Sequence, residues 1–181
     1  MADIRSFPPI AGASARLLIL GSIPGKASLE ANQYYAHPRN LFWPIMADLL
    51  GCGPLPDYAS KVQMLLKANI ALWDVMKSCF RPGSLDASIA KESIVANDFK
   101  AFFGRHPFIS HVFFNGAAAE QAFRRLVLPE LDGYSLICQR LPSTSPAHAG
   151  MTFQQKLDCW RMITCVPRDG KSAFQISTST S

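Results

Sequence analysis

The residues best suited to chemistry gather in a few short segments, and residues 33–43, QYYAHPRNLFW, are the most unusual of these. Four aromatic rings, a histidine, an arginine and an asparagine stand in this stretch, which has two aliphatic side chains, Ala36 and Leu41. Aromatic rings beside amide and imidazole groups suit recognition of a planar heterocycle by stacking and hydrogen bonding. A structural interpretation is equally open, with Asn40 as the N-cap of a helix that begins near it.

Residues 21–30, GSIPGKASLE, follow the first apolar run of the chain. Two glycines and a proline let the backbone turn tightly and approach a ligand closely. The segment contains neither GxGxxG nor GxxxxGK[ST], the motifs of dinucleotide and phosphate loops. Taken alone, it is better explained as a structural turn.

Residues 140–150, RLPSTSPAHAG, follow the last apolar run. Two prolines stiffen this segment, and Ser143, Thr144 and Ser145 offer hydroxyls and backbone amides that can hold a phosphate or a nucleic-acid backbone. A turn that caps the next helix explains a Ser/Thr-Pro loop equally well.

Two polar side chains end apolar runs, Asp74 in ALWDV and Asn115 in FFNG. A carboxylate or amide at such a position faces a ligand crevice, so both are candidate base-binding residues, and Asp74 can also activate water. Structural roles remain open, because Asp74 can cap the next turn or pair with Arg81, and Asn115 can form the turn before Gly116.

Predicted strands and helices alternate along the chain. The strands are the apolar runs 15–21, 69–75, 108–116 and 134–141, and helical periodicity marks residues 40–51, 57–68, 116–127 and 151–164. Runs that are apolar on both faces indicate a central sheet covered on both sides. The alternation indicates a parallel α/β sheet, in which ligands bind beyond the carboxyl ends of the strands. The segments described above fall at that edge.

Composition limits the class of protein. The chain has 181 residues, of which 49% are apolar, so we expect one domain over residues 1–171 and a flexible tail over residues 172–181. No apolar run reaches the roughly 18 residues that span a bilayer, and the N-terminus has no signal-peptide pattern. A net charge of +5 permits an anionic partner without demanding one.

The five cysteines form no CxxC pair, and their spacing suits neither a zinc site nor an iron–sulfur cluster. We therefore expect no metal site. We also expect reduced and mostly buried cysteines in a cytoplasmic protein.

Several motifs together carry a family resemblance. GSIPG, AHPRNLFW and PSTSP, in this order, resemble the uracil-DNA glycosylase superfamily, and AHPxNxFW is shared with its mismatch-specific members. QYYAHPRN, ALWDV and RPGSLD resemble most closely its hypoxanthine-DNA (deoxyinosine) glycosylase branch, over about residues 15–165. One motif would be weak, whereas their joint occurrence in this order is specific.

The resemblance implies a three-layer α/β/α sandwich around a four-stranded parallel sheet. It also implies a monofunctional glycosylase without metal or cofactor, which we expect to be a monomer. Such an enzyme flips a deaminated base, foremost hypoxanthine, out of double-stranded DNA, hydrolyses its N-glycosidic bond and leaves an abasic site.

The chain departs from the uracil-specific pattern at two positions. Ile23 stands where those members carry an Asp or Asn that orients water, and Leu141 stands where a His or Asn contacts the base. His148, seven residues later, is not assumed to replace that group. These departures argue against ordinary uracil excision, and the deoxyinosine branch relies on the asparagine that matches Asn40.

The resemblance also implies roles for single residues. Tyr35 would stack on the flipped base, and Asn40 would orient the attacking water. We expect the backbone amides of Ser22 and Ile23 to contact the base carbonyl and Asp74 to accept a ring N–H.

The last loop would contact DNA directly. Ser143 and Ser145 would press on the phosphates beside the lesion, and the tip, residues 146–149, would enter the gap that the base leaves. The loop residues so assigned are Pro142, Ser143, Thr144, Ser145 and His148.

Three other functions stay open from the residues. The same fold could serve a non-catalytic nucleic-acid or nucleotide binder, or a uracil or mismatch glycosylase. A serine hydrolase would use Ser22, Asp74 and His148, but the chain lacks the GxSxG turn of such enzymes.

Overall fold

The centre of the molecule is a parallel sheet of four strands, seen in a computed structural model that describes residues 3–54, 57–82 and 89–166. The strands are β2 (Leu17–Gly21), β3 (Ile70–Asp74), β6 (His111–Asn115) and β7 (Ile137–Leu141), in the order β3-β2-β6-β7. Each pairs in parallel with its neighbour. These are the four strands predicted from the sequence, so the expected α/β class is confirmed.

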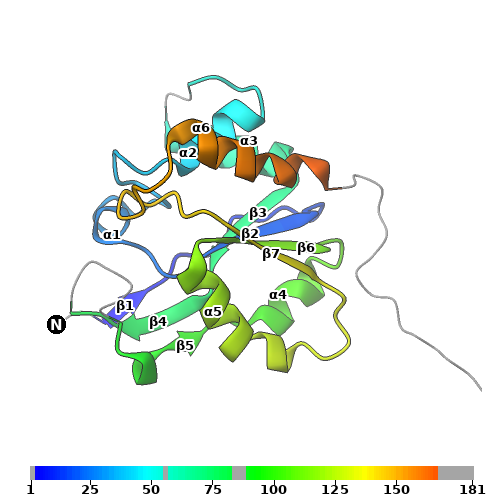
Figure 1. The fold of residues 1–181 in the computed structure, drawn as a ribbon. Coiled ribbons are helices and arrows are strands. Elements are labelled where there is room, and N and C mark those ends of the chain that lie inside the picture. Colours follow the sequence, from blue (N-terminus) through cyan, green and yellow to red (C-terminus); the bar gives the residue numbers. More distant parts are fainter. Residues whose placement is uncertain (1–2, 55–56, 83–88, 167–181) are drawn as a thin grey trace, which may run out of the picture.

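Helices cover both faces of the sheet, as Figure 1 shows. One face carries α2 (Phe42–Leu49), α3 (Tyr58–Lys67) and α6 (Phe153–Trp160), and the other carries α4 (Phe99–Arg105) and α5 (Ala117–Leu126). A short helix, α1 (Lys26–Ala31), follows β2, and three 3₁₀ turns lie at Lys91–Ser93, Leu128–Glu130 and Arg161–Cys165. Asp57 caps α3, because its side chain accepts a hydrogen bond from the Ser60 amide.

Alternating side chains of the strands supply two cores, one on each side of the sheet. In β2, Leu17 and Ile19 pack toward α2, α3 and α6, whereas Leu18 and Leu20 pack toward α4 and α5. Successive side chains of a strand point to opposite faces, so apolar residues at every position are what a doubly covered sheet requires. The three-layer sandwich is therefore confirmed.

A second, smaller sheet was not predicted. It consists of β1 (Asp3–Arg5), β4 (Met76–Phe80) and β5 (Val95–Ala96), which pair antiparallel in the order β1-β4-β5. Its strands are short and half exposed, so they leave no continuous apolar run in the sequence. The chain passes from β3 into β4 through a bend at Val75, whose amide bonds to the Gly21 carbonyl at 2.9 Å.

Some local expectations are wrong. Helix α2 begins at Phe42, two residues after Asn40, which agrees with the predicted start near Asn40, although Leu41 occupies the N-cap position. Strand β7, at the edge of the sheet, is not covered on both faces, since most of its side chains are exposed and Ile137 is 59% exposed. The cysteines are free, as expected, but Cys52, Cys159 and Cys165 are exposed rather than buried.

The tail over residues 172–181 and residues 83–86 of RPGSLD lie outside the described residues. Within the described part of the chain, every helix is too short or too polar to cross a membrane.

Candidate active site

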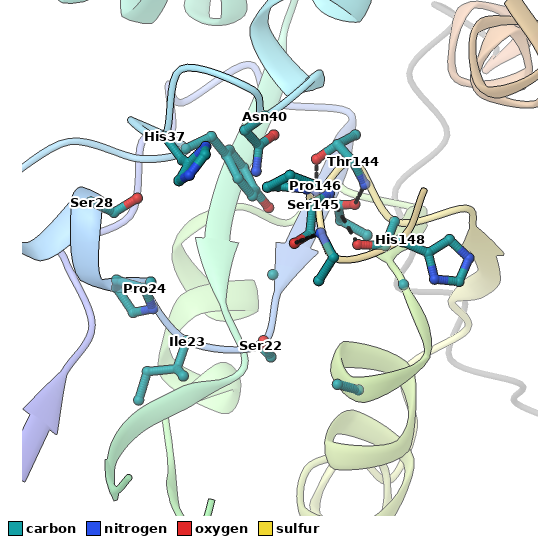
Figure 2. Close-up of a pocket in the computed structure, with 18 of the residues that line it drawn as sticks. Ser22, Ile23, Pro24, Ser28, His37, Asn40, Thr144, Ser145, Pro146 and His148 are labelled. Carbon is teal, nitrogen blue, oxygen red and sulfur yellow. Dashed lines mark hydrogen bonds between the residues drawn. The ribbon is translucent and has the colours of Figure 1, made fainter. Parts of the chain in front are cut away.

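A cavity of about 1210 Å³ opens at the carboxyl edge of the central sheet (Figure 2). Its walls come from the loop after β2, the loop before α2 and the loop after β7. All eleven site residues selected from the sequence line it. The structure thus brings together segments that lie more than 100 residues apart in the chain.

The register of the sheet explains this meeting. Gly21 at the end of β2 pairs with Asp74 at the end of β3, and Asn115 at the end of β6 pairs with Leu141 at the end of β7. Because the strands are parallel and end at the same level, the residues that follow them share one edge. Polar groups that are scattered in the sequence therefore face a common space.

Tyr35 presents a firmly supported ring to this space. Its ring stacks on the fully buried ring of Phe42, with centroids 4.2 Å apart and an interplanar angle of 29°. Its backbone lies in the left-handed region at φ 53°, which is uncommon for a residue with a side chain. Neighbouring Tyr34 fixes the loop, because its hydroxyl donates to the Pro8 carbonyl at 3.1 Å and its own carbonyl accepts from the Trp43 indole at 2.8 Å. One face of the Tyr35 ring is thus supported by Phe42, and the ring forms a flat part of the cavity wall.

The floor of the cavity combines Gly21, Asp74 and the Tyr35 hydroxyl. A Cβ at position 21 would lie 2.9 Å from the Tyr35 hydroxyl oxygen and even closer to Oδ1 of Asp74. Asp74 is 3% exposed, so its carboxylate is a buried charge at the base of the pocket. Burial first, and then the charge of Asp74, raise the pKa of Tyr34 above its usual range. Glycine at position 21 leaves the space that these oxygen atoms occupy.

Asn40 lies on the wall across the pocket from Ser22, beside His37 and Thr144 (Figure 2). Its Oδ1 accepts a hydrogen bond from the Phe42 amide at 3.0 Å, the contact of a helix-capping residue. An amide oxygen has two lone pairs, and the amide nitrogen has two protons. The cap therefore leaves the Asn40 side chain able to bind a water or a base as well.

Asn115 holds the loop after β7 in place. Its Nδ2 donates to Oγ1 of Thr144 at 2.9 Å, and its Oδ1 accepts from the Thr144 amide at 2.8 Å. The Thr144 carbonyl accepts in turn from the Leu41 amide at 3.0 Å, which ties the loop to the start of α2. Thr144 is fully buried. Asn115 thus positions this loop through one proton and one lone pair of its amide, and its expected contact with a base stays a prediction.

The same loop has a compact internal structure. Oγ of Ser143 accepts from the Ser145 amide at 3.2 Å, and Oγ of Ser145 accepts from the Ala147 amide at 3.3 Å. A hydroxyl that accepts such a bond keeps its own O–H for donation. Ser143 and Ser145 can therefore each donate to a phosphate oxygen without rearrangement of the loop.

Five polar side chains are buried in the described part of the chain; four of them line this cavity, and Lys156 contacts the loop after β7 from outside the lining. They are Ser28, Asp74, Arg81, Thr144 and Lys156. Arg81 donates to the Pro24 carbonyl at 2.9 Å, and the Ser28 hydroxyl accepts from the Ala36 amide at 3.2 Å. Sequence reasoning missed Ser28 and Lys156 and took Arg81 only as a possible partner of Asp74. A usable signal existed for Lys156, since it lies four residues before Trp160 and so on the buried face of α6.

The lining of the cavity carries more positive than negative charge. Its charged lining residues are Lys26, Arg39, Arg81 and Arg140 against Glu30 and Asp74. Arg39 and Arg140 come from different walls, and both are exposed. Exposed guanidinium groups on either side of a pocket suit a polyanion that lies across its mouth.

Two other arrangements of side chains are not formed in the described part of the chain. Within residues 3–54, 57–82 and 89–166, no three His, Cys, Asp or Glu side chains gather as metal ligands would. Figure 2 shows the imidazole of His148 pointing away from Ser22, so these two residues do not form the nucleophile and base of a hydrolase.

Comparison with known proteins assigns the family. The model of the uracil DNA glycosylase superfamily matches residues 8–166. The chain belongs to this superfamily. Two relatives named hypoxanthine DNA glycosylase, from Methanosarcina acetivorans and Methanosarcina barkeri, are each 36% identical to it. The first alignment covers 80% of this chain and 87% of the relative, and the second covers 62% and 70%.

A solved structure agrees with the superfamily assignment. The solution NMR structure of a protein described as a uracil DNA glycosylase candidate from Methanosarcina acetivorans matches with a TM-score of 0.72 and 30% identity. The match covers 90% of this chain and 99% of the other. The family resemblance inferred from the sequence motifs is thus confirmed, and with it DNA as the substrate class.

Proposed function

We propose that this protein is a monofunctional DNA glycosylase that excises hypoxanthine from deoxyinosine in double-stranded DNA. The observation that carries the proposal is the Tyr35 ring, backed by Phe42, beside the buried carboxylate of Asp74 in one open cavity. The names of the two Methanosarcina relatives support the same substrate. A base stacked in a duplex cannot reach this cavity, so the nucleotide must be flipped out of the helix.

Hypoxanthine matches the groups at the floor of the cavity. Its N1 carries a proton beside a carbonyl, and a carboxylate such as Asp74 can accept that proton in a hydrogen bond. The carbonyls of Gly21 and Ser22 accept from the Val75 and Met76 amides at 2.9 and 3.0 Å. In a planar trans peptide the N–H group points opposite to the carbonyl oxygen. The N–H groups of Ser22 and Ile23 therefore point away from Val75 and Met76, and they can donate to the base carbonyl. Adenine has a lone pair at N1 instead, which a carboxylate repels.

The reaction needs a water molecule and a stabilised leaving group. The bond between N9 and C1′ breaks, its electron pair leaves with the base, and the water oxygen forms the new bond to C1′. The water releases one proton, which neutralises the departing base. Asn40 orients this water through its side-chain amide, and the amides of Ser22 and Ile23 stabilise the charge that develops on the base.

A panel of labelled duplexes tests the proposal. Each duplex carries hypoxanthine, uracil, xanthine or adenine at one position, opposite each normal base, and is treated with alkali after incubation. We expect strand breaks at hypoxanthine that depend on the alkali step, because a monofunctional enzyme leaves an intact abasic strand. Breaks at uracil and none at hypoxanthine would make the protein a uracil glycosylase. Binding without any break would make it a non-catalytic DNA-binding protein.

Removal of the stacking ring has a defined expected effect. Tyr35→Ala should lower the single-turnover rate of hypoxanthine excision about tenfold, within the roughly 1–3 kcal/mol that stacking contributes per base. The loss stays moderate because Phe42 lies directly behind the ring and becomes a partial replacement surface. Tyr35→Phe is the matched control, since it keeps the ring and should stay close to the wild-type rate. Equal losses in both variants would assign the role to the hydroxyl instead.

A further inference from the structure

One face of α6 holds the start and the tip of the loop that follows β7. The Trp160 indole nitrogen donates to the Pro142 carbonyl at 3.0 Å, and the Lys156 ammonium donates to the His148 carbonyl at 2.7 Å. The two donors are four residues apart, so they lie one above the other on the same side of the helix. The helix thus spans the loop from its first residue to its tip.

Lys156 is unusual because its charge is buried. The residue is 2% exposed, and it forms no ion pair within residues 3–54, 57–82 and 89–166. Burial without an opposite charge disfavours an ammonium group and lowers its pKa. Methionine or leucine would fill the same place on the apolar face of α6 at a smaller desolvation cost. The hydrogen bond to the His148 carbonyl is the contact that offsets the desolvation cost of the Lys156 ammonium.

His148 is the point at which the loop tip is attached. Its amide donates to the Ser145 carbonyl at 3.0 Å, which closes a turn. Residues 147–149 of the tip are exposed, so few contacts other than the Lys156 bond fix the position of the tip above the cavity. A tip that must enter a duplex has to be held at a defined height, since ordering it at the moment of binding would cost conformational entropy.

We propose that Lys156 is a positioning residue for base flipping, which holds the tip of this loop ready to fill the gap in the duplex. The inference rests on the proposed glycosylase function. Lys156 acts through the His148 carbonyl and reaches neither the base nor the attacking water. Its loss should therefore impair the opening of a paired base more than the cleavage of a base that has no partner.

Two duplexes separate these effects. In one, deoxyinosine faces cytosine, and in the other it faces a tetrahydrofuran abasic analogue, which leaves no pair to break. With Lys156→Met we expect a loss of at least about tenfold, or 1.4 kcal/mol, in the single-turnover rate on the first duplex and less than threefold on the second. Lys67→Met is the control for lost charge, because Lys67 is exposed on α3 and far from the cavity lining, and it should change neither rate.

Folding is checked separately by thermal melting. If Lys156→Met does not fold, Trp160→Phe removes the donor at the other end of the brace while it keeps an aromatic ring. The same preferential loss on the cytosine duplex would support the proposal. Equal losses on both duplexes, or none, in a folded variant would overturn it. A wild-type protein that is inactive on both duplexes would reject the glycosylase function itself.

Discussion

Asn40→Ala is expected to lower the single-turnover rate of hypoxanthine excision by about 100-fold or more, the range found when a single positioned group for a reacting water or charge is removed. The dissociation constant for the deoxyinosine duplex should stay within about threefold of the wild-type value, because Asn40 is not among the residues that we expect to contact the phosphates. Ile23 is the physical reason for so large an effect. The resemblance places Ile23 where uracil-specific members carry a water-binding group, and its buried aliphatic side chain cannot hold a water, so we assign the water to Asn40 on the wall of the cavity.

The capping bond of Asn40 complicates this experiment and also supplies its control. Alanine removes the bond to the Phe42 amide as well, which costs about 1 kcal/mol of stability. Asn40→Asp keeps an oxygen for that amide and a second oxygen for water. We expect this variant to melt like the wild type and to keep much more activity than Asn40→Ala. A near wild-type rate for Asn40→Ala would remove Asn40 from the mechanism.

The sheet could be predicted because its signal is local. Strands such as β2 and β6 are buried on both faces, and their continuous apolar runs mark them in the sequence. The end of a parallel strand then marks the site, which is how Asp74 and Asn115 were selected. The edge strand β7 was placed correctly, although the exposure of Ile137 shows that its apolar character does not come from burial alone.

Other features depend on contacts between distant segments. The Leu41 amide, just before α2, bonds to the carbonyl of Thr144 more than 100 residues later. The engagement of Asn115 with that same loop could not be read from FFNG, which fits a simple turn equally well. The spacing from Trp160 places Lys156 on the buried face of α6, but its bond to the His148 carbonyl depends on how α6 lies against the loop. Sequence patterns thus identified the groups at the site but not which of them bind each other.

Asp74→Asn should change which purine the enzyme selects. A carboxylate only accepts hydrogen bonds, so it favours the N1 proton of hypoxanthine and repels the N1 lone pair of adenine. An amide of the same shape can present either an acceptor or a donor, and it no longer carries the charge that doubles the strength of such a bond. We expect the ratio of hypoxanthine to adenine excision to fall by about 100-fold or more, since sites built around a buried polar contact discriminate by large factors.

The measurement compares single-turnover rates on deoxyinosine and deoxyadenosine duplexes of the same sequence. Asp48→Asn is the control for net charge, because Asp48 is exposed on α2 and does not line the cavity. The effect is large because the Asp74 carboxylate is buried, with 3% of its surface exposed. Water cannot reach this position, so a base that loses its hydrogen bond to Asp74 gains no bond to water instead. If Asp74→Asn keeps both rates within twofold of the wild type, the N1 edge of the base does not face Asp74. The base would then enter the cavity in another orientation, with specificity set by the backbone amides of Ser22 and Ile23.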